Sequence, residues 1–342
     1  MSPRPTLRTP AELAQAGLIA AAERTGVEAV AARYAVALTP AVVDLMDPTD
    51  PLDPIARQYV PSSAELTELP EERADPIGDA AYSPVKGLVH RYPDRVLLTP
   101  LLVCPVYCRF CFRRARVGDG DATMSEAEIE TALAYVAARP ELREVILTGG
   151  DPLMLPPARI KALIARILAI PHVELVRIHS RIPVSDPGRV TPDMAAALAS
   201  TAEGAVWLAV HVNHPRELSE IARAALARLA DAGVPLLSQT VLLKGVNDTP
   251  EVMADLMRAL VRNRVRPYYL HHPDLAPGTS HFRPSIAEGQ ALMRALRGRL
   301  SGMAQPTYVL DIPGGAGKVP VGPGYWDGET VTDPNGAGHA YP

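Results

Sequence analysis

All three cysteines of this chain lie within the stretch CPVYCRFCFRR, where Cys104, Cys108 and Cys111 have the spacing CxxxCxxC. A single cysteine is most often a small core residue, but three at this spacing are better suited to binding metal. A structural zinc site needs four protein ligands, and the neighbouring residues include no good fourth one. A four-iron cluster is normally held by four thiolates, so three would leave one iron open to a substrate or cofactor.

Three arginines flank these cysteines, namely Arg109, Arg113 and Arg114. A cluster with thiolate and sulfide ligands is negatively charged, so nearby arginines would favour anionic species beside it. The sequence therefore predicts that these arginines attract an anionic ligand close to the metal.

The composition of the chain limits the classes of protein it can belong to. It has 342 residues, of which 47% are hydrophobic, and a formal net charge of -4 at pH 7. This length suits one large domain with appendages. The charge gives no general attraction to nucleic acid or an anionic membrane, and no apolar run resembles a signal peptide or a membrane span. We therefore expect a cytoplasmic protein, in which cysteines stay reduced and available for metal.

Six short apolar runs follow one another from about residue 95, separated by segments of helical character. They are RVLLTPLLV, EVILTGG, VELVRIHS, VWLAVHV, PLLSQTVLL and VRPYYLHH. Their spacing of roughly 30 residues suits a strand, a helix and a return, which predicts parallel strands with crossover helices. Pro100 in the first run argues for an edge strand, and an open, partial barrel has such an edge. We therefore predict an α/β fold with a partial barrel of six strands.

Two further regions flank this predicted core. Residues 1 to about 45 have apolar residues at helical spacing, and a connector rich in proline and aspartate follows. We predict three zones: a helical N-terminal region with its connector over 1–90, a barrel core over 91–300, and a C-terminal segment over 301–342.

Residues that can do chemistry follow three of the predicted strands. The cysteine stretch follows the first run, GGDP at 149–152 follows the second, and Asp274 follows the sixth. Sites in such folds lie where strands end and loops begin, so we expect these segments to meet.

A second glycine-rich segment, PGGAGKVP, lies near the end of the chain. It is not a P-loop, because that motif requires serine or threonine after the lysine, and here Val319 follows Lys318. Taken alone, a lysine among glycines is most often an exposed turn residue.

The ordered set of motifs resembles a known family. The CxxxCxxC loop after a first strand is similar to the radical S-adenosylmethionine (SAM) superfamily, in which the open iron of a [4Fe-4S] cluster chelates SAM. From about residue 30 to 326, the segments HRYPDRVLL, LTGGDPL, HVNHP, VRPYYLHHPDL and PTYVLDIPGGAGKVPV together resemble lysine 2,3-aminomutase. The resemblance implies a radical SAM partial (β/α)6 barrel with a helical N-terminal extension and a short C-terminal segment carrying a lysine for pyridoxal phosphate (PLP).

The resemblance also implies which residues contact the cofactors. Cys104, Cys108 and Cys111 match the ligands of the cluster. Lys318 matches the lysine that forms a Schiff base with PLP, and its glycines would let the backbone approach that cofactor. The glycine-rich motif that approaches the SAM amine matches Gly149, Gly150 and Asp151. The remaining cofactor contacts implied by the resemblance are Arg91, Tyr92, Arg95, His211 and Gln239.

The implied substrate is L-lysine. Arg113 matches the arginine that binds the substrate carboxylate, and Asp274 and Asp311 match two carboxylates that hold the side-chain ammonium. A buried charge without its partner costs roughly 3 to 5 kcal/mol, so two aspartates favour a cation and disfavour a glutamate side chain. The implied reaction is a 2,3-amino shift, in which a 5'-deoxyadenosyl radical removes hydrogen from C3 and nitrogen moves from C2 to C3 on PLP.

Three other interpretations remain open from the sequence. A short relative makes β-lysine to modify elongation factor P, and the length and the RIHSR segment of this chain are similar to it. A non-catalytic iron–sulfur electron-transfer protein would leave Lys318 and the two aspartates unexplained. An ordinary PLP enzyme with a structural metal would leave the three-cysteine pattern unexplained. The resemblance further implies an electron donor such as flavodoxin or ferredoxin, and a homo-oligomer.

Overall fold

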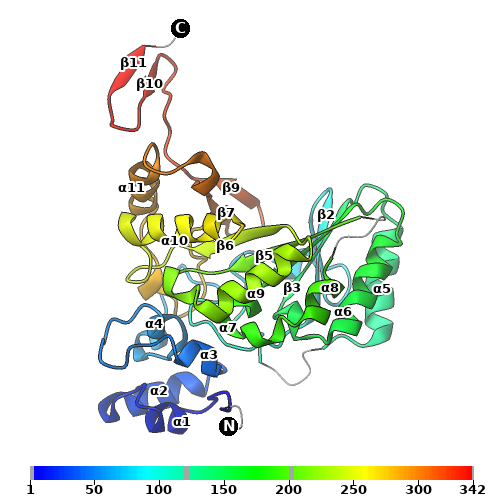
Figure 1. Cartoon of the computed structure of the whole chain (residues 1–342), viewed down its shortest axis with the longest axis horizontal. Helices are drawn as coiled ribbons and strands as arrows, with labels where there is room; N and C mark the ends of the chain where they lie inside the picture. The colour runs from blue at the N-terminus through cyan, green and yellow to red at the C-terminus, as the bar shows by residue number, and fades with distance from the viewer. Residues whose placement is uncertain (1–3, 119–122, 200–203, 341–342) are drawn as a thin grey trace.

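A nine-stranded sheet forms the centre of the computed structural model, which describes residues 4–118, 123–199 and 204–340. Its strands follow one another in chain order from β1 to β9. Strands β2 to β8 are parallel, while β1 and β9 pair antiparallel at the two ends. Helices cover the outside of this curved sheet, as Figure 1 shows.

The strands of the central sheet are β1 (Leu88–Tyr92), β2 (Arg95–Leu101), β3 (Glu144–Gly149), β4 (Leu175–Ser180), β5 (Ala205–His211), β6 (Leu236–Val241), β7 (Val265–His271), β8 (Thr307–Ile312) and β9 (Gly317–Pro320). A separate hairpin near the C-terminus consists of β10 (Thr330–Thr332) and β11 (Gly338–Ala340). The helices are α1 (Pro10–Gln15), α2 (Arg24–Ala31), α3 (Pro40–Val43), α4 (Ala56–Tyr59), α5 (Glu126–Ala137), α6 (Pro157–Leu168), α7 (Ile182–Ser185), α8 (Pro192–Ala197), α9 (Glu220–Asp231), α10 (Pro250–Arg262) and α11 (Ile286–Leu296).

The six apolar runs of the sequence form strands β2 to β7, which confirms the predicted α/β partial barrel. The sheet also continues beyond them. Strand β8 is a seventh parallel strand, and β9 turns back along it through the glycine-rich loop. This C-terminal part of the chain therefore extends the same sheet.

The prediction that Pro100 marks an edge strand is wrong. Strand β2 has a neighbour on each side, β1 antiparallel and β3 parallel. Within β2, Pro100 lies beyond Leu98, the last residue of the register with β1. The register of β2 with β3 is irregular at the same place, between Leu98 and Leu101. At such an irregularity a missing N–H costs little, and the Pro100 carbonyl accepts a hydrogen bond from the Met124 amide at 3.0 Å.

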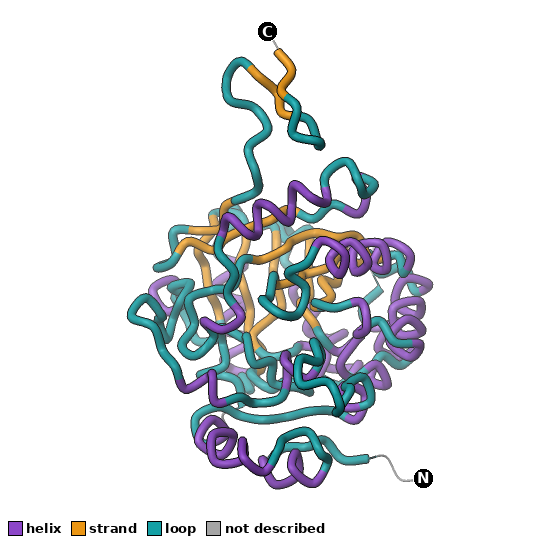
Figure 2. The backbone as a smooth tube through the Cα atoms, turned by 90° about the vertical axis from the view of Figure 1, so that its left-hand side faces the viewer, coloured by secondary structure: helices purple, strands orange, loops and turns teal. Residues whose placement is uncertain are grey.

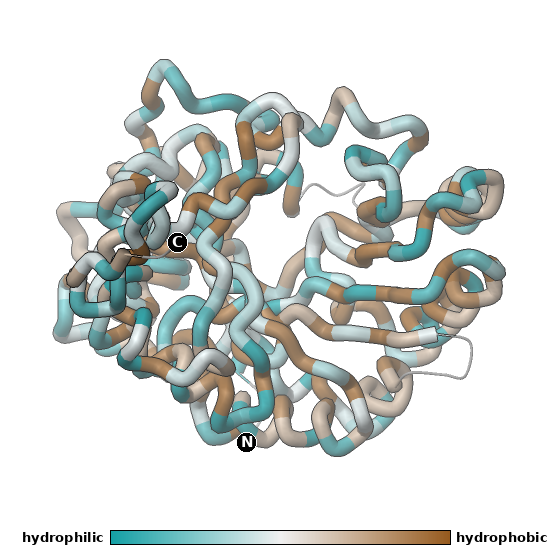
Figure 3. The backbone as a smooth tube through the Cα atoms, turned by 90° about the horizontal axis from the view of Figure 1, so that it is seen from above, coloured by the Kyte–Doolittle hydropathy of each residue, from teal (hydrophilic) through white to brown (hydrophobic). Residues whose placement is uncertain are grey.

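The main hydrophobic core lies between the sheet and the helices that cover it. Helix α6 is representative, because its buried residues Ile160, Leu163, Ile164 and Ile167 recur at the spacing of one helical face. Helix α5 begins with a capping box between Ser125 and Glu128. Colouring by hydropathy shows brown hydrophobic stretches along the strands and the helices beside them (Figure 3).

The N-terminal helices form a second, smaller core behind the cysteine stretch. Leu13, Val27, Ile55 and Tyr59 are buried there together with Val106, which lies between two of the cysteines in sequence. Figure 2 shows these helices at the end of the molecule opposite the β10–β11 hairpin. The N-terminal extension therefore supports the loop that carries the cysteines. Within the described ranges, the helices are too short or too polar to cross a membrane.

Candidate functional site

The inside of the partial barrel contains a cavity of about 460 Å³. Such a volume is typical of sites for small molecules and cofactors. Every residue that the family resemblance implies as a cofactor or substrate contact lines this cavity: Arg91, Tyr92, Arg95, Cys104, Cys108, Cys111, Arg113, Gly149, Gly150, Asp151, His211, Gln239, Asp274, Asp311 and Lys318. Residues that are far apart in sequence thus meet at one place, as expected for a parallel sheet.

The three cysteines lie in the loop that leaves β2. Burial raises the pKa of all three thiols, and brings that of Cys108 to about 11. Thiols in this environment remain protonated at neutral pH until a metal displaces the protons. In the described parts of the chain, no three His, Cys, Asp or Glu side chains are arranged to hold a single metal ion. An iron–sulfur cluster provides a separate iron for each thiolate, so its ligands need not converge on one point.

The glycines of GGDP pack against the start of the cysteine loop. Gly149 has a φ of +107°, and a Cβ there would lie 2.8 Å from the Thr99 Cβ. A Cβ on Gly150 would lie 2.5 Å from the backbone nitrogen of Val103. Both positions therefore require glycine, because the backbone after β3 closely approaches the backbone after β2.

The Asp151 carboxylate holds the ends of β3 and β4 together. It accepts hydrogen bonds from the Ser180 hydroxyl at 2.8 Å and from the amides of Arg181 and Ile182 at 2.7 and 3.1 Å. It also accepts one from the amide of Leu153 at 3.1 Å. This carboxylate is therefore engaged within the protein, and it fixes the position of the GGDP loop.

Two of the arginines that flank the cysteines do not face the cavity. Arg109 and Arg114 are buried and both pair with Glu65, whose side chain is fully buried. The prediction that these two arginines attract an anion close to the metal is wrong, because their guanidinium groups pair with Glu65 and do not line the cavity. Arg113 does line the cavity.

Arg113 shares a carboxylate with Arg91. The buried Asp79 accepts a hydrogen bond from the Arg91 guanidinium at 2.7 Å and from that of Arg113 at 2.8 Å. One arginine was predicted to contact PLP and the other to bind the substrate carboxylate. Asp79 therefore fixes the relative position of two groups that were assigned to different ligands.

Lys318 is held by residues from several strands. It stands opposite Asp311 in the antiparallel β8–β9 pair, and its ammonium forms an ion pair with that carboxylate. Its Nζ also lies 3.2 Å from Nδ1 of His271, at the end of β7. Its backbone amide donates a hydrogen bond to the Tyr92 hydroxyl at 2.7 Å, and Arg95 stacks on the Tyr92 ring.

Asp274 lies near this ion pair and is half-buried in the wall of the cavity. Burial, and next the charge of Asp311, raise the pKa of Asp274 to about 7. Two neighbouring carboxylates in a buried place repel each other, and a bound cation relieves that repulsion. This corner of the cavity is therefore suited to an ammonium group.

Several buried polar atoms at the cavity have no hydrogen-bond partner in the parts of the chain that are described. They are Nε of Arg91, Nε2 of His179 and Oε1 of Gln239. Burial also lowers the pKa of His211 to about 3, so its ring is neutral at pH 7. Unpartnered buried donors and acceptors indicate a polar ligand, because leaving them unpaired costs free energy.

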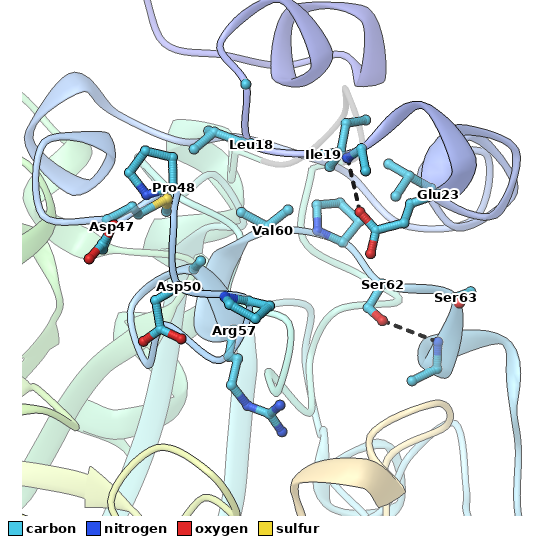
Figure 4. A pocket seen from close by; sticks show the side chains of 18 of the residues that line it. Leu18, Ile19, Glu23, Asp47, Pro48, Asp50, Arg57, Val60, Ser62 and Ser63 are labelled. Atoms are coloured by element: carbon cyan, nitrogen blue, oxygen red, sulfur yellow. Dashed lines mark hydrogen bonds between the residues drawn. The ribbon is translucent and has the colours of Figure 1, made fainter.

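A second cavity, of about 680 Å³, lies among the N-terminal helices and connector (Figure 4). It is larger than the first, but it contains none of the predicted site residues. Two polar side chains drawn there serve local turns, since Glu23 accepts from the Ala20 amide and Ser62 from the Ala64 amide. We therefore assign the site to the cavity inside the barrel.

Two family models and several known proteins match this chain. The family model described as Radical SAM superfamily matches residues 98–257, and the one described as Lysine-2,3-aminomutase matches residues 293–330. L-lysine 2,3-aminomutase of Clostridium subterminale is 45% identical over 303 residues, which cover 89% of this chain and 72% of that protein. This chain belongs to the lysine 2,3-aminomutase family. The L-lysine 2,3-aminomutase of Acetoanaerobium sticklandii is 44% identical, with coverages of 89% and 73%.

Glutamate 2,3-aminomutase of Clostridioides difficile is also related, at 37% identity over 89% of this chain and 71% of that protein. The lysine 2,3-aminomutase family is a PLP-dependent branch of the radical SAM superfamily, so a [4Fe-4S] cluster, SAM and PLP are its cofactors. Membership of this family excludes two of the earlier interpretations of the chain, a non-catalytic electron-transfer protein and an ordinary PLP enzyme. The cavity fits these cofactors, because it combines three thiols, several cationic side chains and unpartnered polar atoms.

The sequence alone missed two residues of the site, Asp79 and His271. His271 ends a predicted strand, and that position could have indicated it, because site residues gather at strand ends. Asp79 lies in the connector before β1, and only the folded chain brings it to the two arginines.

Proposed function

We propose that this protein is an L-lysine 2,3-aminomutase, which moves the amino group of lysine from C2 to C3 to give β-lysine. The observation that carries this proposal is the placement of Asp274 and Asp311 in one cavity with Lys318 and the three cysteines. The carboxylates form a site for a cation at the far end of a substrate. The family relationship supports the same reaction.

In this proposal each group of residues holds one cofactor. The three cysteines bind the cluster, the loop of Gly149, Gly150 and Asp151 contacts SAM, and Lys318 carries PLP. The other PLP and SAM contacts come from Arg91, Tyr92, Arg95, His211 and Gln239. When bound, these cofactors would supply a carbon-centred radical and a conjugated system that accepts the substrate radical while the nitrogen migrates.

The residues of the chain orient the substrate between these groups. Arg113, held by Asp79, binds the substrate carboxylate, while Asp274 and Asp311 bind the ammonium at the other end. Binding at both ends fixes the carbon chain of the substrate, so that C3 is presented in one orientation. The Lys318 ammonium is paired with the Asp311 carboxylate. It leaves that carboxylate when Lys318 binds PLP.

The two aspartates also determine which amino acid the site accepts. A glutamate side chain would place a third carboxylate beside two others, and a buried charge without a partner costs roughly 3 to 5 kcal/mol. We therefore expect turnover of lysine and little turnover of glutamate. The experiment compares the two amino acids with the anaerobically reconstituted protein, and equal or faster turnover of glutamate would contradict the proposal.

We also propose a cytoplasmic location, a homo-oligomeric state and an electron donor of the flavodoxin or ferredoxin type. The cytoplasm keeps cysteines reduced, as the cluster ligands require. To test the choice of partner, such a donor replaces the chemical reductant, and reduction of the cluster by one electron is measured. Light scattering of the reconstituted protein measures the oligomeric state.

A further inference from the structure

We propose that His271 is the residue that exchanges a proton with Lys318 when PLP is attached to this lysine or released from it. The inference rests on the proposed function, because it takes Lys318 as the lysine that binds PLP. It adds a catalytic role for a side chain that the sequence motifs did not single out.

The contact between the two side chains is the basis of this proposal. Nδ1 of His271 lies 3.2 Å from Nζ of Lys318, within reach of direct proton transfer. Asp311 bonds to the same nitrogen from β8, and its Oδ2 lies 3.9 Å from Nδ1 of His271. All three side chains are largely shielded, with exposed fractions of 11 to 21%.

The hydrogen bond on the far side of the imidazole determines which ring nitrogen carries the proton. It therefore decides whether Nδ1, which faces Lys318, can accept a proton. Nε2 of His271 lies 3.1 Å from the amide nitrogen of Gln239, while Oε1 of Gln239 is buried with no partner among the described residues. The oxygen and nitrogen of an amide are interchangeable by a half turn. After that turn, Nε2 of His271 donates a hydrogen bond to Oε1 of Gln239, and the amide nitrogen faces the neutral His211, which interacts with Gln239.

This arrangement leaves the lone pair of Nδ1 directed at Lys318. Burial, and next the charge of Lys318, hold the pKa of His271 well below its usual range, so the ring is neutral at pH 7. A neutral imidazole can accept a proton, whereas an imidazolium cannot. The titratable and polar groups that contact this ring or act on its charge are Lys318 from β9, Asp311 from β8, Tyr269 from β7, Gln239 from β6, His211 from β5, and Arg177 and His179 from β4.

A proton acceptor is needed because the ion pair with Asp311 favours the protonated form of Lys318. An ammonium has no lone pair, so it cannot attack the aldehyde carbon of PLP. In the step that we propose, His271 first removes one proton from the Lys318 ammonium. The free amine then forms a bond to the aldehyde carbon, and one of its protons moves to the former aldehyde oxygen.

The second half of the step returns the proton. His271 gives its proton to the hydroxyl that was the aldehyde oxygen, water leaves, and a protonated carbon–nitrogen double bond remains. Atoms and charge balance, because one ammonium and one aldehyde become one protonated imine and one water. His271 ends neutral, as it began, and the reverse sequence releases Lys318.

The experiment measures attachment of PLP to the full-length chain without cluster or SAM, so it does not depend on turnover. PLP is mixed with protein purified without it, and the visible absorbance band and borohydride-trapped peptide are followed in time. General acid–base catalysis typically contributes 10² to 10⁴-fold, so His271→Asn is expected to slow attachment roughly a hundredfold. The final amount attached should equal that of wild type, since a proton carrier changes rate and not equilibrium. Added imidazole should restore part of the rate to His271→Ala.

The matched control is His272→Asn, which changes the next residue in the chain. His272 is hydrogen-bonded to the Tyr308 hydroxyl at 2.7 Å, and we expect its variant to attach PLP at the wild-type rate. Attachment at the wild-type rate in His271→Asn would overturn the proposal. So would a reduced final amount with no rescue by imidazole, which would indicate a structural role. If the trapped peptide contained a lysine other than Lys318, the proposed function itself would be contradicted, whatever the rate in the variant.

Discussion

Asp311 and Lys318 stand directly opposite each other across β8 and β9, and their side chains form an ion pair. In the proposed function each of them binds something else, Asp311 the substrate ammonium and Lys318 the cofactor. The proposed function therefore requires PLP and lysine to replace this ion pair. The substrate ammonium then takes the place that the Lys318 ammonium occupies.

Changing Asp311 to asparagine removes one charge and nearly preserves the shape of the side chain. The loss of a charge-assisted contact of about 1.5 to 3 kcal/mol should lower the specificity for lysine by roughly ten- to a hundredfold. Norleucine has no side-chain ammonium, so its turnover should fall much less. The measurement is kcat/KM for both amino acids in wild type and Asp311→Asn.

The control for this variant is Asp231→Asn, which changes an exposed aspartate paired with Arg264 and should leave both values unchanged. An equal loss for lysine and norleucine in Asp311→Asn would mean that Asp311 only positions Lys318. The choice of lysine would then depend on Asp274 alone.

The raised pKa of Asp274 predicts a pH dependence of substrate binding. Burial, followed by the charge of Asp311, raises this pKa to about 7, so the carboxyl is protonated below pH 7 and ionised above it. Only the ionised form pairs with an ammonium, so KM for lysine should rise as pH falls through 7, by up to about tenfold per pH unit. Asp274→Asn should have a higher KM and a flatter profile. A KM that is independent of pH in wild type would contradict this role.

The sequence predicted much of the fold and of the site, for identifiable reasons. Strands β2 to β7 were predictable because each is a short run rich in apolar and β-branched residues, and the runs recur at intervals that suit a crossover helix. Strand β9 was not, since its four residues lie in a glycine-rich segment and pair only after the chain turns back. The cysteines were found from their spacing along the chain. The contacts of Asp79 with two arginines, and of Glu65 with two others, join distant segments and leave no local pattern.

The three cysteines are predicted to be the only protein ligands of the cluster. Replacing any one of them by alanine should abolish SAM cleavage in the anaerobically reconstituted protein, because a cluster with two thiolates is not held in place. The chain should still fold, as judged by circular dichroism. Retained SAM cleavage in any of the three variants would show that the cysteine in question is not a ligand.

Glu65 is predicted to stabilise the fold by forming buried ion pairs with both Arg109 and Arg114. Changing Glu65 to glutamine leaves two buried guanidinium groups without a counterion, and should lower the free energy of unfolding by about 3 to 5 kcal/mol. Glu68→Gln, which breaks an exposed pair with Arg33, should cost less than about 1 kcal/mol. Urea unfolding of the cofactor-free proteins measures both values. Similar losses in the two variants would contradict the assigned role of Glu65.

The central claim is that the α-amino nitrogen of lysine migrates from C2 to C3. Lysine with a nitrogen-15 label at the α-amino group, incubated with the anaerobic protein containing cluster, SAM, PLP and reductant, tests it directly by nuclear magnetic resonance of the product. The account predicts β-lysine with the label retained on C3, and no product when any one cofactor is omitted or when Lys318 is changed to alanine. Unlabelled product, product formed without SAM or PLP, or turnover of glutamate but not of lysine would contradict it.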